Sequence, residues 1–261
     1  MEPATLEQPP RPTPTSGQSQ RVLVVVPAYN EAQTVAAVLG EIRRALPGVA
    51  VVVVDDGSDD GTADICRRLN VECLVLPFNL GVGGAMRTGF LYAQRGDFDV
   101  VVQIDADGQH DPAFAPAMLA ELDQGADLVV GSRYAGIGRY EAPFPRRVAM
   151  SVVSRLLSRA CGTSLNDATS GFRASGRAAI HLFACTYPAD YLGDTLQSLI
   201  IASRAGLVIR QSPVRMRQRS GGRPSQGIVN SVRYLGRSAF HVAIGTQTRP
   251  ERAWRRRSAV R

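Results

Sequence analysis

The sequence predicts an α/β fold with a mostly parallel central sheet flanked by helices, in a single domain followed by a basic C-terminal helix and tail. Its 261 residues, of which 44% are hydrophobic, suffice for one substantial core. Short apolar runs alternate with segments of helical periodicity, which is the order of βαβ units in a parallel sheet. Runs such as residues 22–26 are apolar at successive positions, as expected of strands buried on both faces.

The first half of the domain follows a proline-rich arm, residues 1–20, which we expect to be disordered because it has too little apolar surface to bury. A strand is predicted over residues 22–26, where Pro27 ends it. Asn30 is placed to cap a helix over residues 31–46. The pattern then predicts strand 49–54, helix 61–69, strand 72–76, helix 85–94 and strand 100–104.

The second half continues with a helix over residues 112–122 and a strand over residues 127–130. The other predicted elements are helix 146–160, a short strand within 168–173, helices 178–183 and 192–205, strand 207–214 and a final amphipathic helix 228–244. No apolar run approaches the ~20 residues of a membrane-spanning helix, and residues 1–20 lack the apolar core of a signal peptide. We therefore expect a cytoplasmic protein.

Polar loops follow the first four predicted strands. Their sequences are Pro27-Ala28-Tyr29-Asn30-Glu31, Asp55-Asp56-Gly57-Ser58, Phe78-Asn79-Leu80-Gly81 and Asp105-Ala106-Asp107. In parallel sheets the ligand crevice lies beyond the carboxyl ends of the strands, so the four loops are expected to converge there. Four unrelated polar loops are the alternative, and the agreement of all four disfavours it.

Two carboxylates, Asp105 and Asp107, stand where the fourth strand ends. Hard divalent cations such as Mg²⁺ and Mn²⁺ prefer oxygen ligands and keep positions open for substrate phosphates. The pair therefore indicates a metal site for a substrate that carries a diphosphate. A plain polar turn is the alternative, because Asp-Gly is a common turn pair.

The net charge of +7 is unevenly distributed along the chain. Sixteen arginines and 22 acids precede residue 204, whereas 14 arginines and the single acid Glu251 follow from there. Such a basic segment favours an anionic partner, either a phosphorylated lipid, a membrane surface or a nucleic acid. A solvated tail is the alternative for residues 249–261.

Together these motifs resemble those of family-2 glycosyltransferases with the GT-A fold, and among them the polyprenyl- or dolichyl-phosphate mannose and glucose synthases. The match spans residues 21–226. The segments that carry it are Val26 to Glu31, Val54 to Thr62, Asn79-Leu80-Gly81 with Gly83-Gly84-Ala85, Asp105 to His110, Gly131-Ser132-Arg133-Tyr134, Thr169 to Arg173, and Arg219 with Gly222 and Ser225. The resemblance implies metal-dependent transfer from a nucleotide-sugar, with inversion at the anomeric carbon.

The resemblance also divides the chain and assigns donor residues. Residues 21–111 would form the nucleotide-sugar-binding half, residues 112–226 the acceptor half, and residues 227–261 an amphipathic helix with an arginine-rich tail. The residues implied for the nucleotide-sugar are Pro27, Tyr29, Glu31, Asp56, Gly84, Asp105, Ala106 and Arg133. A packing role for the glycines and a surface salt bridge for Arg133 are the alternatives.

The metal would be Mg²⁺ or Mn²⁺, held by Asp105, Asp107 and Gln109. Asp107 would thereby serve catalysis by stabilising the leaving nucleoside diphosphate. His110 is a weaker metal candidate that we interpret as a loop residue.

The acceptor implied by the resemblance is a polyprenyl phosphate, bound by Arg217, Arg219 and Ser225, with Arg219 also assisting catalysis. A phosphate is already an anionic nucleophile, whereas a sugar hydroxyl needs a carboxylate base. Asp194 or Asp190 would be that base, although the family more often has glutamates there. Gln226 also departs from the family, which often has a lysine after the serine.

Residues 228–244 could lie on an anionic bilayer at the inner face of the membrane, pack in the core or form a homo-oligomer contact. Besides a polyprenyl phosphate acceptor and a UDP- or GDP-linked donor, two alternatives stay open. One is a hydroxyl acceptor on a glycan or metabolite. The other is a non-catalytic protein that binds nucleotide-sugar or nucleic acid; nucleic acid is disfavoured because the basic segment lacks interleaved aromatic residues.

Overall fold

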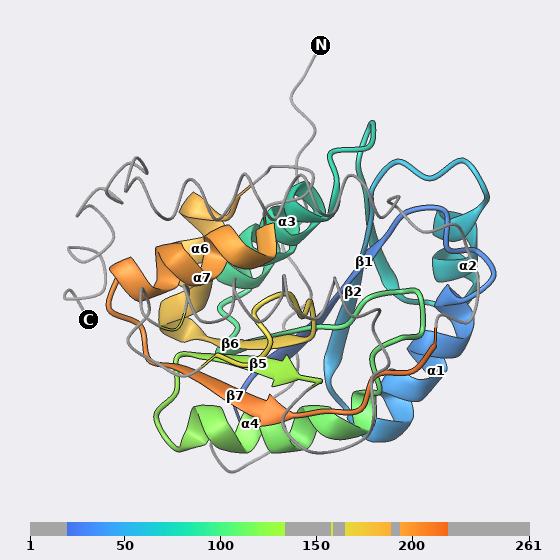
Figure 1. The fold of residues 1–261 in the computed structure, drawn as a ribbon. Helices are drawn as coiled ribbons and strands as arrows, with labels where there is room; N and C mark the ends of the chain where they lie inside the picture. The colour runs from blue at the N-terminus through green and yellow to red at the C-terminus, as the bar shows by residue number, and fades with distance from the viewer. Residues whose placement is uncertain (1–19, 134–157, 159–164, 189–193, 219–261) are drawn as a thin grey trace, which may run out of the picture.

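The computed structural model describes residues 20–133, 158, 165–188 and 194–218. These residues form a seven-stranded sheet with the order β3-β2-β1-β4-β6-β5-β7. All neighbouring strands run parallel except β6, which is antiparallel to both β4 and β5. The prediction of a mostly parallel sheet flanked by helices is confirmed (Figure 1).

The strands are short and the helices that connect them run back along the sheet. The strands are β1 Val22–Ala28, β2 Ala50–Asp55, β3 Glu72–Val75, β4 Val100–Gln103, β5 Leu128–Ser132, β6 Arg173–Gly176 and β7 Ile209–Pro213. The helices are α1 Val35–Ala45, α2 Thr62–Arg68, α3 Val82–Arg95, the 3₁₀ helix η1 Pro112–Phe114, α4 Ala115–Asp123, α6 Arg177–Thr186 and α7 Asp194–Arg204.

Helices cover both faces of the sheet, which explains why the central strands are apolar at successive positions. Along β1, Val25 packs into the core between the sheet and helices α3, α6 and α7. Val24 and Val26 pack into the core on the other face, between the sheet and helices α1, α2 and α4. All three valines are fully buried. Residues that alternate along one strand thus belong to two separate cores.

Some boundaries differ from the predicted ones for local reasons. β1 continues through Pro27, which pairs in register with Val54. The helix expected from residue 31 begins at Val35, because Asn30 adopts a left-handed φ of 55° and cannot serve as its cap. The helix expected from residue 85 begins at Val82, which places Gly83 and Gly84 in its first turn.

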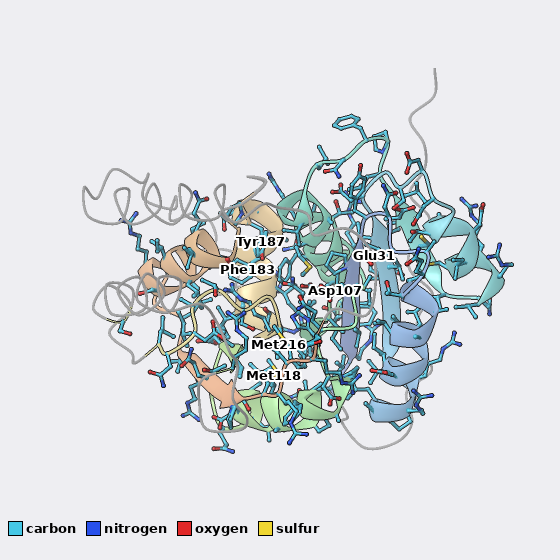
Figure 2. All side chains as sticks on the ribbon, turned by 45° about the vertical axis from the view of Figure 1, so that its right-hand side comes forward. Glu31, Asp107, Met118, Phe183, Tyr187 and Met216 are labelled. Atoms are coloured by element: carbon cyan, nitrogen blue, oxygen red, sulfur yellow. The ribbon has the colours of Figure 1, made fainter. Side chains whose placement is uncertain are left out.

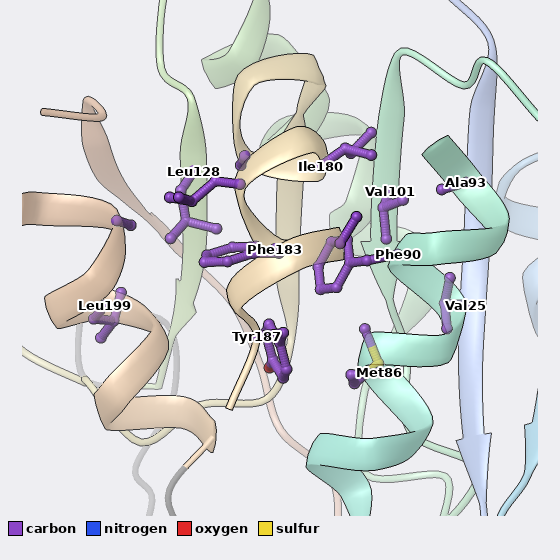
Figure 3. Close-up of a cluster of buried hydrophobic side chains, with 14 of the residues drawn as sticks. Val25, Met86, Phe90, Ala93, Val101, Leu128, Ile180, Phe183, Tyr187 and Leu199 are labelled. Atoms are coloured by element: carbon purple, nitrogen blue, oxygen red, sulfur yellow. The ribbon is translucent and has the colours of Figure 1, made fainter. Parts of the chain in front are cut away.

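An aromatic cluster fixes α3 and α6 to each other (Figure 3). The ring centroid of Phe90 lies 5.1 Å from that of Phe183 and 5.2 Å from that of Tyr187. Phe183 and Tyr187 meet edge to face at 5.2 Å, a favourable aromatic geometry. Because Tyr187 directly follows α6, the cluster also fixes the point from which the chain continues toward α7.

Phe183→Ala is expected to lower the free energy of unfolding by about 3–5 kcal/mol, because the cavity left by a buried ring cannot close completely. Phe183 is 1% exposed, whereas Phe78 is 62% exposed and serves as the matched control. Phe78→Ala should stay within about 0.5 kcal/mol of the wild type. Urea denaturation followed by circular dichroism measures both, and equal losses for the two variants would contradict this view of the core.

Several predicted segments lie outside the described residues. They are the arm up to residue 19, the predicted helix 146–160 apart from residue 158, Asp190 and the predicted helix 228–244 with the tail. Among the residues that the structure does describe, no helix has the length and apolar character required to cross a membrane.

Candidate active site at the carboxyl edge of the sheet

The loops that follow β1, β2 and β4 lie side by side at one edge of the sheet. The backbone N–H of Asp56 donates to the carbonyl of Ala28 at 2.8 Å. The N–H of Ala106 donates to the carbonyl of Pro27 at 3.4 Å. The structure therefore brings together loops that are far apart in the sequence, as the parallel strand order predicts.

Side chains of the loop after β2 hold the loop after β1. The backbone N–H of Asn30 donates to Ser58 Oγ (2.9 Å), and that of Glu31 donates to Thr62 Oγ1 (3.0 Å). Ser58 is held in turn, because its backbone N–H donates to Asp55 Oδ1 (3.0 Å) and its hydroxyl donates to the same oxygen. The two predicted donor-binding loops consequently form one rigid unit.

The residues of the loop after β1 that are predicted to contact the nucleotide differ in their exposure to solvent. Pro27 and Glu31 are buried, and Tyr29 is 44% exposed. The Thr34 hydroxyl donates to Glu31 Oε2 at 2.8 Å, which fixes the carboxylate at the start of α1. Tyr29 thus offers an open aromatic face on which a base can stack, while Glu31 offers acceptor oxygens.

Asp56 ties the loop after β3 to the loop after β2. Its Oδ1 accepts the N–H of Leu80 and its Oδ2 accepts the N–H of Gly81, each at 2.7 Å. Burial raises the pKa of the Asp56 carboxyl, against the effect of these two hydrogen bonds, and the neighbouring charge of Asp55 adds to the rise. Each oxygen retains a second lone pair, so the predicted role of Asp56 toward the nucleoside is compatible with this structural one.

Packing explains why position 84 is a glycine. A Cβ atom at this position would lie 2.4 Å from the Cβ of Leu80, so any other residue would displace the loop that Asp56 holds. Packing was one of the two alternatives that the sequence left open. Contact between Gly84 and a ligand stays a prediction.

The acidic loop after β4 is held by its own hydrogen bonds. Gln103 Nε2 donates to Asp105 Oδ1 (3.0 Å), and the N–H of Gln109 donates to Asp107 Oδ1 (2.9 Å). The Asp105 side chain is 33% exposed, while Asp107 is 9% and Ala106 is 1% exposed. Ala106 is thus almost fully enclosed, and its contact with the donor stays a prediction.

The donor set of this loop fits a hard divalent cation. Asp105, Asp107 and Gln109 supply carboxylate and amide oxygens, which Mg²⁺ and Mn²⁺ prefer. Within the described residues no group of three or more Asp, Glu, His or Cys side chains could hold a metal alone. Two carboxylates completed by substrate phosphates is the usual arrangement for Mg²⁺. In Figure 2, Asp107 lies near the centre of the molecule, between Glu31 and Met216.

Arg133, at the end of β5, is paired with a buried acid. Its Nε and one terminal nitrogen donate to the two oxygens of Asp167 at 2.6 and 2.7 Å, and the same terminal nitrogen donates to Thr169 Oγ1 at 2.6 Å. Burial alone would raise the pKa of Asp167, but the hydrogen bonds and charge of Arg133 hold that pKa below its usual value. The ion pair is buried, so the alternative of a surface salt bridge is wrong. The predicted contact of Arg133 with the donor stays a prediction.

Arg173 joins the edge of the sheet to the beginning of α7. Because β6 is antiparallel, its first residue lies at the same edge as the ends of the parallel strands. The Arg173 guanidinium donates to Ser198 Oγ (2.7 Å), to the Thr195 carbonyl (2.7 Å) and to the Ser170 carbonyl (2.9 Å). Asp194 is the first residue of α7, so the proposed base belongs to a helix that is anchored at this edge.

The segment after β7 passes alongside the acidic loop. The N–H of Arg217 donates to the Gln109 carbonyl at 2.9 Å. The Arg217 guanidinium lies 2.6 Å from Glu41 Oε2 and 2.9 Å from Asp111 Oδ1. β7 ends at Pro213, so Arg215 and Arg217 lie beyond the strand. Arg219 and Ser225 lie outside the described residues.

Residues 23–182 match the model of glycosyl transferase family 2. The chain belongs to glycosyltransferase family 2. This confirms the resemblance inferred from the strand-end motifs.

Several named sugar transferases resemble the chain over much of its length. It is 36% identical to the polyprenol monophosphomannose synthase of Mycolicibacterium smegmatis, over 61% of this chain and 63% of that protein. It is 34% identical to the undecaprenyl-phosphate mannosyltransferase of Micrococcus luteus, over 82% of this chain and 93% of the relative. It is 32% identical to the dolichyl-phosphate hexose transferase of Haloferax volcanii, over 76% and 83%.

A solved glycosyltransferase shares the fold. Glucosyl-3-phosphoglycerate synthase of Mycobacterium tuberculosis, in complex with Mn²⁺, UDP-glucose and phosphoglyceric acid, superposes with a TM-score of 0.66. The match covers 88% of this chain and 81% of that one, at 23% identity. This likeness confirms the predicted GT-A fold class.

Two polar residues at the edge of this family-2 glycosyltransferase, Asp167 and Gln103, were not recognised as site residues from the sequence, and His110 was considered only as a weaker metal candidate. Asp167 pairs with Arg133 from 34 positions away, Gln103 supports Asp105, and the loop residue His110 is 3% exposed. One signal was available for Asp167, because a buried arginine requires an acidic partner and this acid lies just before Thr169. Nothing in the local pattern distinguishes Gln103, and nothing in it predicts the burial of His110.

Proposed function

We propose that the chain is a metal-dependent, inverting glycosyltransferase that moves a sugar from a UDP- or GDP-linked donor to a polyprenyl phosphate. The observation that carries the proposal is the acidic loop Asp105 to Gln109. This loop is joined on one side to the donor loops and on the other to the arginine-bearing segment after β7. Three relatives named as polyprenyl- or dolichyl-phosphate sugar transferases support the acceptor class.

On the donor side, the rigid pair of loops after β1 and β2 would receive the nucleoside. Tyr29 stacks on the base, and Pro27 forms the apolar floor beside it. Glu31 and Asp56 accept hydrogen bonds from the base or the ribose, since carboxylates offer only acceptors. Both carboxylates are already fixed by the protein, so little conformational freedom is lost when the donor binds.

At the acidic loop, Asp105, Asp107 and Gln109 would hold Mg²⁺ or Mn²⁺ together with the donor diphosphate. When bound, the cation neutralises the charge that develops on the leaving nucleoside diphosphate. The chain's own contribution is to fix the oxygen ligands, through the N–H of Gln109 on Asp107 and the amide of Gln103 on Asp105. Arg133 lies at the same edge with its charge already balanced by Asp167, so a contact with the donor phosphates would have to share its guanidinium with that acid.

On the acceptor side, a lipid phosphate needs positioning by cations more than deprotonation. Arg217, Arg219 and Ser225 are proposed to bind it, and Arg215 is exposed in the same segment. Arg217 would have to share its guanidinium with Glu41 and Asp111. Contact of residues 228–244 with the inner face of the membrane is part of the same proposal.

The proposal is tested by incubating the purified chain with Mn²⁺ or Mg²⁺, polyprenyl phosphate and a panel of radiolabelled UDP- and GDP-sugars. Label should pass into the lipid phase with at least one donor, and only when metal is present. A thermal-shift series with the same donors identifies which nucleotide the chain binds, because only a bound donor stabilises the fold. Binding without labelled lipid for any donor would refute the lipid acceptor.

A hydroxyl acceptor is the second candidate function, favoured by the anchoring of α7 through Arg173. Asp194→Asn should lower transfer by about 10²–10⁴-fold if Asp194 is a general base, and should matter little if the acceptor is a phosphate. Asp190→Asn tests the other carboxylate in the same way. Initial rates at saturating donor, compared with the wild type, distinguish the two acceptors.

A further inference from the structure

His110 is enclosed beneath the acidic loop and lies outside the proposed ligand set. It is 3% exposed, and its ring stacks on Phe172 with the centroids 5.1 Å apart and the planes 15° from parallel. Its backbone forms a β-bridge to Met216, in the segment that follows β7. Phe172 and Met216 both belong to the acceptor half, whereas His110 belongs to the donor half.

The imidazole makes a directed contact with Asp105. The backbone N–H of Asp105 donates to His110 Nδ1 at 3.0 Å. Because a backbone amide can only donate, Nδ1 must be the unprotonated nitrogen, and the neutral ring carries its proton on Nε2. Nε2 lies 3.7 Å from Asp105 Oδ2, so the polar edge of the ring faces both the backbone and the carboxylate of Asp105.

The surroundings leave Asp105 little room for another position. Gln103 Nε2 donates to Asp105 Oδ1 at 3.0 Å. A Cβ atom on Gly171 would lie 3.1 Å from Asp105 Oδ2 and 3.5 Å from His110 Cε1, so a larger residue there would press on the Asp105 carboxylate. The stacked ring of Phe172 keeps the imidazole from rotating. Asp105 is thus held through Gln103 and His110, with Gly171 close beside its carboxylate.

We propose that His110 is a positioning residue, which fixes the backbone and carboxylate of Asp105 for the metal and the donor diphosphate. This inference rests on the proposed function of the acidic loop. A buried histidine that only filled space would need neither the ring orientation nor the unprotonated Nδ1. Outer residues that orient a ligand typically change metal affinity or activity by about 10–100-fold when replaced.

Two substitutions separate the hydrogen bond from the packing. His110→Phe keeps an aromatic ring against Phe172 and removes the acceptor. His110→Asn removes the ring but can place its Oδ1 where Nδ1 now accepts the Asp105 N–H. His181 is the matched control, because its Nδ1 pairs with Gln94 at 2.9 Å in the contact between α3 and α6, and it receives the same two substitutions.

The measurements are hydrogen exchange of the Asp105 amide and Mn²⁺ affinity by calorimetry, in the presence of UDP or GDP. We expect His110→Phe to speed exchange of the Asp105 amide and to weaken Mn²⁺ binding by about 10–100-fold. His110→Asn should have an Asp105 exchange rate and a Mn²⁺ affinity close to those of the wild type. The two His181 variants should change neither quantity. The KM for the donor should rise more than kcat falls, because the defect is in assembling the binding loop.

The inference is overturned if His110→Phe binds Mn²⁺ as the wild type does while only its melting temperature falls. It is equally overturned if His110→Asn and His110→Phe lose the same affinity, because packing alone would then explain the loss. These readouts measure binding, whereas the proposed function is judged by labelled lipid. A chain that shows the His110 effect without labelled lipid would refute the acceptor and leave the positioning role in place.

Discussion

Asp107→Asn is expected to lower metal-dependent sugar transfer by about 10²–10³-fold, comparable to the loss of one group that stabilises transition-state charge. The amide removes the negative charge that would hold the cation. Its side-chain oxygen can still accept the N–H of Gln109, as Asp107 Oδ1 does at 2.9 Å, so the loop should keep its shape. The transfer rate as a function of Mn²⁺ concentration measures the effect.

The control for Asp107→Asn is Asp123→Asn, at the exposed end of α4. It removes the same charge from the chain at a distance from the acidic loop, and it should leave the Mn²⁺ dependence unchanged. Thermal unfolding of both variants verifies that the fold is intact. Wild-type activity in Asp107→Asn would show that the acidic loop is only a turn.

Asp167→Asn is expected to destabilise the protein by about 3–5 kcal/mol, because it leaves the charge of Arg133 buried without its carboxylate. The side chains of Arg133 and Asp167 are only 8% and 0% exposed. The exposed pair of Arg67 and Asp64 provides the control, since surface ion pairs contribute about 0–1 kcal/mol and Asp64→Asn should be nearly neutral. Urea denaturation measures both variants.

The difference between wild type and Asp167→Asn should also depend on pH. The pKa of Asp167 is lowered in the folded state, so its contribution is fully present above the unfolded pKa of about 3.9. That contribution is lost as pH falls through the folded pKa. The stability advantage of the wild type should therefore be constant above about pH 5 and shrink in more acidic buffer. An advantage that grows as the pH falls would contradict the assigned ion pair.

Much of the fold follows from the sequence because its strands are apolar on both faces. Runs such as β1 must be covered by helices on each side, which predicts the layers and the parallel direction. The antiparallel direction of β6 could not be predicted, because Arg173–Gly176 is short and a local pattern carries no strand direction. The predicted start of α1 was wrong because the Asn30 side chain does not cap the helix. Its Oδ1 instead accepts the N–H of Asp59 in the neighbouring loop at 3.0 Å.

The site was predictable to the extent that it depends on strand ends. Carboxyl ends of parallel strands share one edge, so the convergence of Asp56 with the acidic loop required no knowledge of contacts. Contacts between distant segments carry no local signal. Arg217 pairs with Glu41 across 176 positions, and Asp167 was overlooked as the partner of Arg133. Arg217 is an example. It belongs to the basic C-terminal segment and was predicted to bind the acceptor, whereas in the structure its guanidinium pairs with Glu41 and Asp111.

A lipid phosphate is the nucleophile in the proposed reaction. The most direct measurement compares polyprenyl phosphate with the corresponding polyprenol as acceptors for the full chain, Mn²⁺ and the radiolabelled donor that the chain binds. We predict labelled lipid with the phosphate and none with the alcohol. Equal labelling of both acceptors, or label in the polyprenol alone, would show that the nucleophile is not the lipid phosphate.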